Sequence, residues 1–115
     1  MEGELKDLAS LLEGMGFRVV AARERFRTLD RLDVAEVWVV RAYSKGEPRA
    51  KITVSSSGGG GEFRVHIYLR GVGEGDVEDV VESYGGSIDY IGEDALLVFK
   101  SIDIKKLGEL IEKMF

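Results

Sequence analysis

The sequence predicts an α+β fold in which an antiparallel β-sheet has an N-terminal and a C-terminal helix on one side. Leucine and isoleucine recur at helical spacing near both ends of the chain, and runs of alternating apolar and polar residues fill the middle. Glycine, serine and proline separate these runs, which is typical of hairpins between antiparallel strands. The length of 115 residues is that of one domain, so we expect residues 1–115 to fold as a single unit.

Residues 3–15 are expected to form the first helix, because Leu5, Leu8 and Leu12 fall on one helical face. Four strands are expected next, at 17–27, 34–44, 49–56 and 62–70. The turns between them are predicted at 28–33 and 45–48. Serines followed by four glycines at 55–61 predict a hairpin tip, which is either a plain flexible connection or a clamp that closes over a ligand.

After residue 70 the sequence predicts a loop, a short helix at 76–84, a hairpin of strands 87–91 and 95–100, and a last helix. Ser101 or Asp103 is expected to cap that helix. Its apolar residues share one face and are Ile104, Leu107, Leu110, Ile111 and Met114. This face either packs on the chain's own sheet or forms a homo-oligomer, a dimer or higher, through apolar helix faces.

Positive charge is confined to the middle of the chain. Residues 17–70 contain 11 Lys and Arg against 6 Asp and Glu, whereas residues 71–115 contain 4 against 11, and the formal net charge is −5. We therefore expect a basic sheet module at 17–70 and an acidic helix–hairpin–helix part at 71–115, with different roles for their surfaces.

The basic module predicts a sheet face that binds a polyanion. Arg64, His66 and Tyr68 alternate with apolar residues in the strand 62–70. Lys51 likewise lies between apolar residues in the strand before it, so we expect all four side chains on one face of the sheet. Such a face suits single-stranded nucleic acid, because phosphates bind cations while unstacked bases stack on aromatic rings.

The register of the first two strands decides how far this face extends. One face of the first strand carries three arginines, which we expect on the basic face: Arg23, Arg25 and Arg27. In the second strand, one register puts Arg41 and Tyr43 on the basic face and buries Trp38. A shift by one residue reverses this and brings Trp38 onto the basic face. The first register is favoured, and Trp38 is kept as a stacking candidate.

The predicted function is sequence-independent binding of single-stranded RNA or DNA. The predicted binding residues are Arg23, Arg25, Arg27, Trp38, Arg41, Tyr43, Arg49, Lys51, Arg64, His66, Tyr68 and Arg70. Two alternatives stay open. The basic face docks an acidic protein surface in an assembly or interaction subunit, or it is a solvated face whose arginines pair with Glu24, Glu36 and Glu62.

The sequence predicts no enzyme, no metal site and no cofactor. Cysteine is absent and His66 is the only histidine, so no nucleophile–base pair can be assembled. The glycine-rich loop at 71–75 departs from the dinucleotide-binding spacing, and the acidic residues that follow it would repel a pyrophosphate.

Composition bears on the setting of the protein. No apolar run approaches the roughly 20 residues of a membrane helix, and the first residues are acidic, unlike those of a signal peptide. We therefore expect a cytoplasmic protein with no membrane partner. Asn and Gln are absent along with Cys, a pattern typical of proteins from hyperthermophilic prokaryotes.

In layout the chain resembles the archaeal single-stranded nucleic-acid-binding proteins of the ThermoDBP group. The likeness covers a leading helix, a leucine-patterned last helix at 104–114, and basic strands carrying Arg23, Arg25, Arg27, Arg41, Tyr43, Arg64, Tyr68 and Arg70. It is a likeness of order and composition without a diagnostic motif. The resemblance implies binding of single strands in a cleft with apolar walls and basic edges, by a homo-oligomer. The long zipper-like C-terminal segment of the group's founding member is not evident in this sequence.

Overall fold

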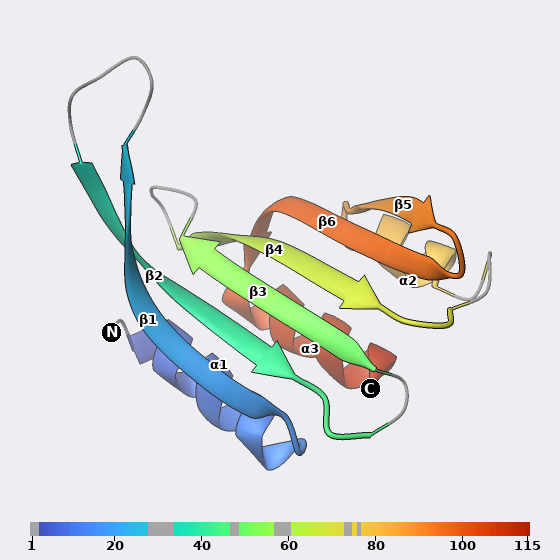
Figure 1. Ribbon diagram of the computed structural model, residues 1–115, viewed down its shortest axis with the longest axis horizontal. Coiled ribbons are helices and arrows are strands. Elements are labelled where there is room, and N and C mark those ends of the chain that lie inside the picture. The colour runs from blue at the N-terminus through green and yellow to red at the C-terminus, as the bar shows by residue number, and fades with distance from the viewer. Residues whose placement is uncertain (1–2, 28–33, 47–48, 57–60, 73–74, 76) are drawn as a thin grey trace.

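The computed structural model describes residues 3–27, 34–46, 49–56, 61–72, 75 and 77–115, with the backbone alone at 26–27 and 34–36. The described chain forms one six-stranded sheet with helices on one of its faces (Figure 1). The elements in chain order are α1 Gly3–Gly14, β1 Arg18–Arg27, β2 Val34–Tyr43, β3 Ala50–Ser56, β4 Glu62–Leu69, α2 Glu78–Ser83, β5 Ser87–Ile91, β6 Asp94–Asp103 and α3 Ile104–Met114. The predicted α+β class and element order are confirmed.

The strands lie in the order β1-β2-β3-β4-β6-β5, and every neighbouring pair is antiparallel. The first four strands follow one another as hairpins. After β4 the chain passes through α2 to the edge strand β5 and returns as β6 beside β4 (Figure 1). The basic module therefore forms four consecutive strands of the sheet, β1 to β4.

The core lies between the sheet and the two terminal helices, because both helices bury one apolar face there. The fully or almost fully buried helix residues are Leu5, Leu8, Leu12, Leu107, Leu110 and Ile111. They meet alternate residues of the central strands, such as Ile52, Val65 and Leu97, which have no exposed surface. Phe115 completes this layer by contacting Phe17 edge to face, with ring centroids 5.2 Å apart.

The apolar face of α3 thus packs on the chain's own sheet, the first of the two alternatives raised by the sequence. Leu107, Leu110 and Ile111 are fully buried there, whereas Ile104 and Met114 are partly buried; a homo-oligomer stays a prediction. In the described ranges, no helix is long and apolar enough to span a membrane.

The second half of the chain differs from the prediction in the bounds of β6 and α2, and it settles which of the two predicted residues caps α3. Strand β6 extends over Asp94–Asp103, because it follows β4 past an irregularity in the pairing between Phe63 and Val65. Asp103 is therefore the cap of α3, and its carboxylate accepts a hydrogen bond from the Lys106 backbone N–H at 2.8 Å. Ser101 lies within β6. Helix α2 is shorter than predicted, with described bounds of Glu78–Ser83.

The register of β2 is the one that the sequence favours. Arg41 and Tyr43 lie on one face of the sheet. Val40 and Ala42 lie on the other face and are fully buried in the core against the helices. Trp38 shares the parity of Val40 and packs against the core from the same side. The predicted turn at 28–33, part of the turn at 45–48, and most of the serine–glycine tip lie outside the described residues.

Candidate nucleic-acid interface

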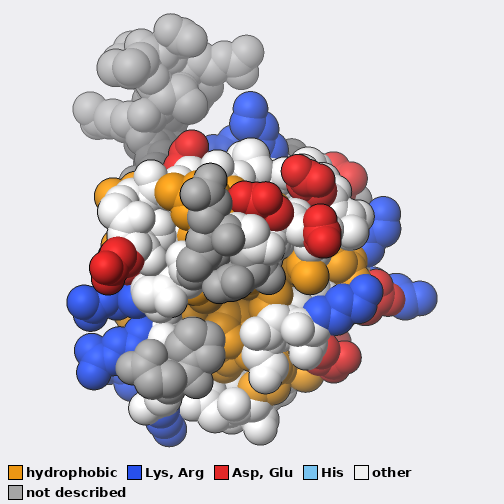
Figure 2. Space-filling model, turned by 90° about the vertical axis from the view of Figure 1, so that its right-hand side faces the viewer, with side chains coloured by type: hydrophobic (Ala, Val, Ile, Leu, Met, Phe, Trp, Pro, Cys, Tyr) orange, Lys and Arg blue, Asp and Glu red, His pale blue; other side chains and the backbone are white. Residues whose placement is uncertain are grey.

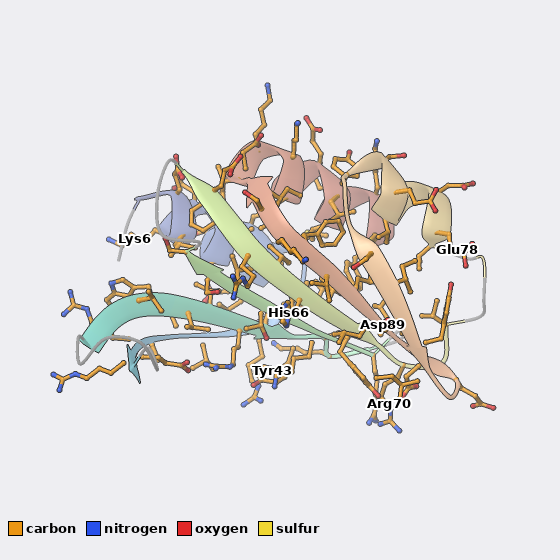
Figure 3. All side chains as sticks on the ribbon, turned by 90° about the horizontal axis from the view of Figure 1, so that it is seen from above. Lys6, Tyr43, His66, Arg70, Glu78 and Asp89 are labelled. Atoms are coloured by element: carbon orange, nitrogen blue, oxygen red, sulfur yellow. The ribbon has the colours of Figure 1, made fainter. Side chains whose placement is uncertain are left out.

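The outer face is the sheet surface that points away from the helices. Tyr43 and Arg70 project from it on the side opposite α1 and α3 (Figure 3). Alternation along each strand, together with the pairing between strands, assigns its residues. In β1 to β4 they include Arg18, Val20, Glu24, Val39, Arg41, Tyr43, Lys51, Thr53, Ser55, Arg64, His66 and Tyr68.

One row of this face alternates cations and aromatic rings. Arg18 in β1 pairs with Tyr43 in β2, and Tyr43 pairs with Lys51 in β3. Lys51 in turn pairs with Tyr68 in β4. We call these four residues the tyrosine row. Adjacent strands lie about 4.8 Å apart, so the row sets positive charges and flat rings side by side across the sheet.

Tyr43 stands between two cations. The Arg18 guanidinium lies 4.9 Å from the centroid of the Tyr43 ring, and the Lys51 ammonium lies 5.8 Å from it. Both distances are within the range of cation–π attraction. The ring therefore orders the two side chains that an approaching phosphate would meet.

Tyr68 is held at its hydroxyl. The hydroxyl donates to the Asp94 carboxylate at 2.5 Å, and the same carboxylate accepts from the Gly71 backbone N–H at 3.2 Å. The hydrogen bond to Asp94 raises the pKa of Tyr68 above its ordinary value. Asp94 has its pKa lowered by the Tyr68 hydroxyl and then by the Gly71 N–H. This pair fixes the position of a half-buried ring at the far end of the row.

The next row of the outer face is partly engaged within the chain. Arg41 and Glu24 form an ion pair with an N–O distance of 2.5 Å, and each side chain is 31% exposed. The hydrogen bond to Glu24 raises the pKa of Arg41. The solvated, ion-paired interpretation therefore holds for Arg41, and a phosphate at this position would compete with Glu24. His66 is exposed in the same row.

A pocket opens where the tyrosine row meets the ends of β2 and β4. It has a volume of about 280 Å³ and is lined by both tyrosines of the row, Ser44, Ala50 and the cations Lys45, Arg49, Lys51 and Arg70. A second hollow of about 360 Å³ adjoins it, sharing Arg49 and Arg70, and adds Gly71, Glu93 and Asp94.

Three arginines of β1 were predicted on the basic face, and that prediction is wrong for Arg23 and Arg25. Arg23 pairs with Trp38, on the parity that faces the helices, and its guanidinium lies 5.4 Å from the Trp38 ring centroid. Arg25 shares this parity. The backbone of Arg27 does too, but its side chain lies outside the described residues. Trp38 is thus separated by the sheet from Tyr43 and Tyr68.

The remaining predicted residues come together on the outer face or at its end: Arg41, Tyr43, Arg49, Lys51, Arg64, His66, Tyr68 and Arg70. Sequence reasoning missed Arg18, Lys45 and Asp94. Arg18 could have been found by closing the β1–β2 hairpin symmetrically, because pairing Arg27 with Val34 brings Arg18 opposite Tyr43. No sequence signal connects Asp94 to Tyr68, which is 26 residues away.

Within the described ranges, no group of three or more His, Cys, Asp or Glu side chains is arranged to hold a metal ion. No family model, no curated protein and no solved structure matches the chain. The resemblance to the ThermoDBP group stays a prediction.

Proposed function

We propose that the outer face binds single-stranded nucleic acid, RNA or DNA, without sequence preference. The observation that carries this proposal is the tyrosine row, in which Arg18, Tyr43, Lys51 and Tyr68 alternate across four strands. The two parts of a nucleotide have different requirements, and this row supplies both within one strand spacing. Binding, without catalysis, is the role that these side chains support.

The cations of the row bind phosphate. Lys51 is exposed at its centre, and Arg18 is exposed at its β1 end. Arg18 also has a planar guanidinium, which stacks on a base as well as pairing with a phosphate oxygen. Charge neutralisation of this kind releases counterions, so the affinity falls as salt rises, with a log–log slope of about −0.7 per phosphate for single strands.

The two tyrosine rings of the row supply the part of the binding that tolerates any base sequence. Every base has a flat face, and stacking on an aromatic side chain contributes about 1–3 kcal/mol per base. Tyr68 is the stronger stacking candidate, because its hydroxyl is tied to Asp94 and its ring is already positioned. Tyr43 has cations beside it on two strands, so a base there would stack in contact with charge. A duplex hides its base faces and gains only the phosphate contacts.

Fluorescence anisotropy with labelled single-stranded RNA, single-stranded DNA and duplex DNA, at several salt concentrations, tests the proposal. We expect single strands to bind more tightly than the duplex. Lys51→Gln should reduce the salt slope by about 0.7. Lys105→Gln is the matched control, because it removes the same charge from an exposed position on α3, on the helix side; it should leave the slope nearly unchanged.

Two variants of Tyr68 separate stacking from hydrogen bonding. Tyr68→Ala should cost about 1–3 kcal/mol of binding free energy, whereas Tyr68→Phe keeps the ring and should retain most of the affinity. Equal losses in the two variants would contradict stacking. Absence of strand binding at low salt would contradict the whole proposal and favour an acidic protein surface as the partner of the outer face.

A further inference from the structure

The pocket at the end of the tyrosine row is lined by more positive charges than the single negative charge of an internal phosphate requires. Four of its lining residues are cations: Lys45, Arg49, Lys51 and Arg70. No carboxylate is found among the described residues that line it. Figure 2 looks onto this end of the molecule and shows Lys and Arg side chains, in blue, on both sides of the apolar surface. Its volume of about 280 Å³ is near the lower limit for sites that hold a small molecule.

Backbone hydrogen bonds build the wall of this pocket, so its cations come from fixed positions. Ser44 donates its N–H to the Ala50 carbonyl at 3.0 Å, and its hydroxyl accepts from the Ala50 N–H at 2.7 Å. These bonds hold Ser44, which directly precedes Lys45, against the start of β3. The Arg70 N–H donates to the Arg49 carbonyl at 3.0 Å, which joins the other two cationic positions.

Negative charge begins directly beyond the pocket. The adjoining hollow shares Arg49 and Arg70 but is also lined by Glu93 and Asp94. The Asp94 carboxylate is held there by the Tyr68 hydroxyl and the Gly71 N–H. A nucleic-acid strand that continued past the pocket would bring its next phosphate against these carboxylates, and like charges at such short range repel. The favourable path for the nucleic acid therefore ends in the pocket.

The phosphate at the end of a nucleic-acid strand differs in charge from a phosphate inside the strand. An internal phosphodiester carries one negative charge, whereas a terminal phosphomonoester carries about −1.5 to −2 at neutral pH and presents three acceptor oxygens. Several converging cations match the second group better than the first. We infer that this pocket binds the terminal phosphate of a single strand, with the next base against Tyr68; the inference rests on the proposed function of the outer face.

The test uses three labelled oligonucleotides of one sequence, with a hydroxyl at both ends, a 5′-phosphate, or a 3′-phosphate. One of the two phosphorylated strands should bind about tenfold or more tightly than the hydroxyl-ended strand. Lys45→Gln should remove most of that difference, because the loss of this charge should weaken binding of the phosphorylated strand more than binding of the hydroxyl-ended strand. Lys105→Gln on α3 is the control that removes the same charge elsewhere.

The outcomes separate this inference from the function on which it rests. Equal binding of all three strands would overturn the terminal-phosphate site and leave the outer-face proposal standing. A phosphate preference that persists undiminished in both Lys45→Gln and Arg49→Gln would locate the phosphate elsewhere and overturn the inference. Binding of none of the strands would overturn both proposals.

Discussion

The Tyr68 hydroxyl ties the tyrosine row to Asp94, the first residue of β6. Its hydrogen bond to Asp94 joins residues from the two halves of the chain, one from the basic module and one from the acidic part. Because Asp94 also accepts from the Gly71 N–H, the carboxylate is held on two sides. A single carboxylate thus positions a candidate stacking ring and marks the acidic limit of the pocket.

Titration of Tyr68 checks this contact. We expect Asp94→Asn to lower the pKa of Tyr68 toward its ordinary value of about 10, because the carboxylate that stabilises the protonated phenol is gone. The raised pKa in the native protein means that the contact stabilises the fold below about pH 10 and is lost as the pH rises through the folded-state value. NMR of labelled tyrosine rings measures the shift. An unchanged pKa in the variant would show that the bond is absent in solution.

The hydrogen bond between Tyr68 and Asp94 is also lost at low pH. The pKa of Asp94 is lowered in the folded protein, so its contribution is present above the unfolded value of about 3.9 and is lost as the pH falls through the folded-state value. The contact is therefore complete throughout the neutral range in which nucleic-acid binding would be measured.

Gly86 is a residue whose lack of a side chain is required by packing. A Cβ there would lie 2.5 Å from Cε1 of Phe99, and the Phe99 ring is 1% exposed, so it has little room to move. We expect Gly86→Ala to lower the free energy of unfolding by about 1–3 kcal/mol, measured by urea denaturation.

Gly108 provides the control for this prediction. It lies inside α3, and its added Cβ would meet Leu11 at 3.7 Å, an ordinary contact. Gly108→Ala should be neutral or stabilise by up to about 1 kcal/mol, from helix propensity. A Gly86→Ala protein as stable as the Gly108→Ala protein would contradict the packing described at Phe99.

At the scale of elements, how far the sequence predicts the structure depends on how clean the alternation is. Strands β3 and β4 were predicted nearly to the residue, because every second residue is apolar and buried. Strand β1 mixes charge and small apolar residues on both faces, so its parity could not be read from composition. The position of Arg23 came from pairing with Trp38 across the hairpin, a constraint between elements.

The candidate site was predictable only in part for the same reason. Lys51 and Tyr68 could each be assigned to a face from their own strands, whereas the face of Tyr43 depended on a choice between two registers. Their alignment in one row depends on the registers of two separate hairpins. The pocket depends further on Lys45 and Arg49 lining the same hollow, and alternation within a single strand contains no information on that arrangement.

At the scale of the molecule, the helices leave one sheet face uncovered. The main core lies on the helix side, so most of the outer face of β1 to β4 can carry charge and aromatic rings; Val39, which is 2% exposed, is the buried apolar residue of this face. The net charge of −5 hides this face, because the excess of acidic residues lies in the part of the chain that forms α2, β5, β6 and α3. Repulsion from that part should restrict a bound nucleic-acid strand to the outer face of β1 to β4.

The most direct test of this account is NMR mapping of the labelled protein during titration with a short single-stranded oligonucleotide. The account predicts that the backbone signals of Tyr43, Lys51 and Tyr68 shift together, while the indole signal of Trp38 and the signals of α1 stay in place. Shifts that cluster at Trp38 and Arg23, or on the helices, would contradict the assignment of the outer face as the binding surface.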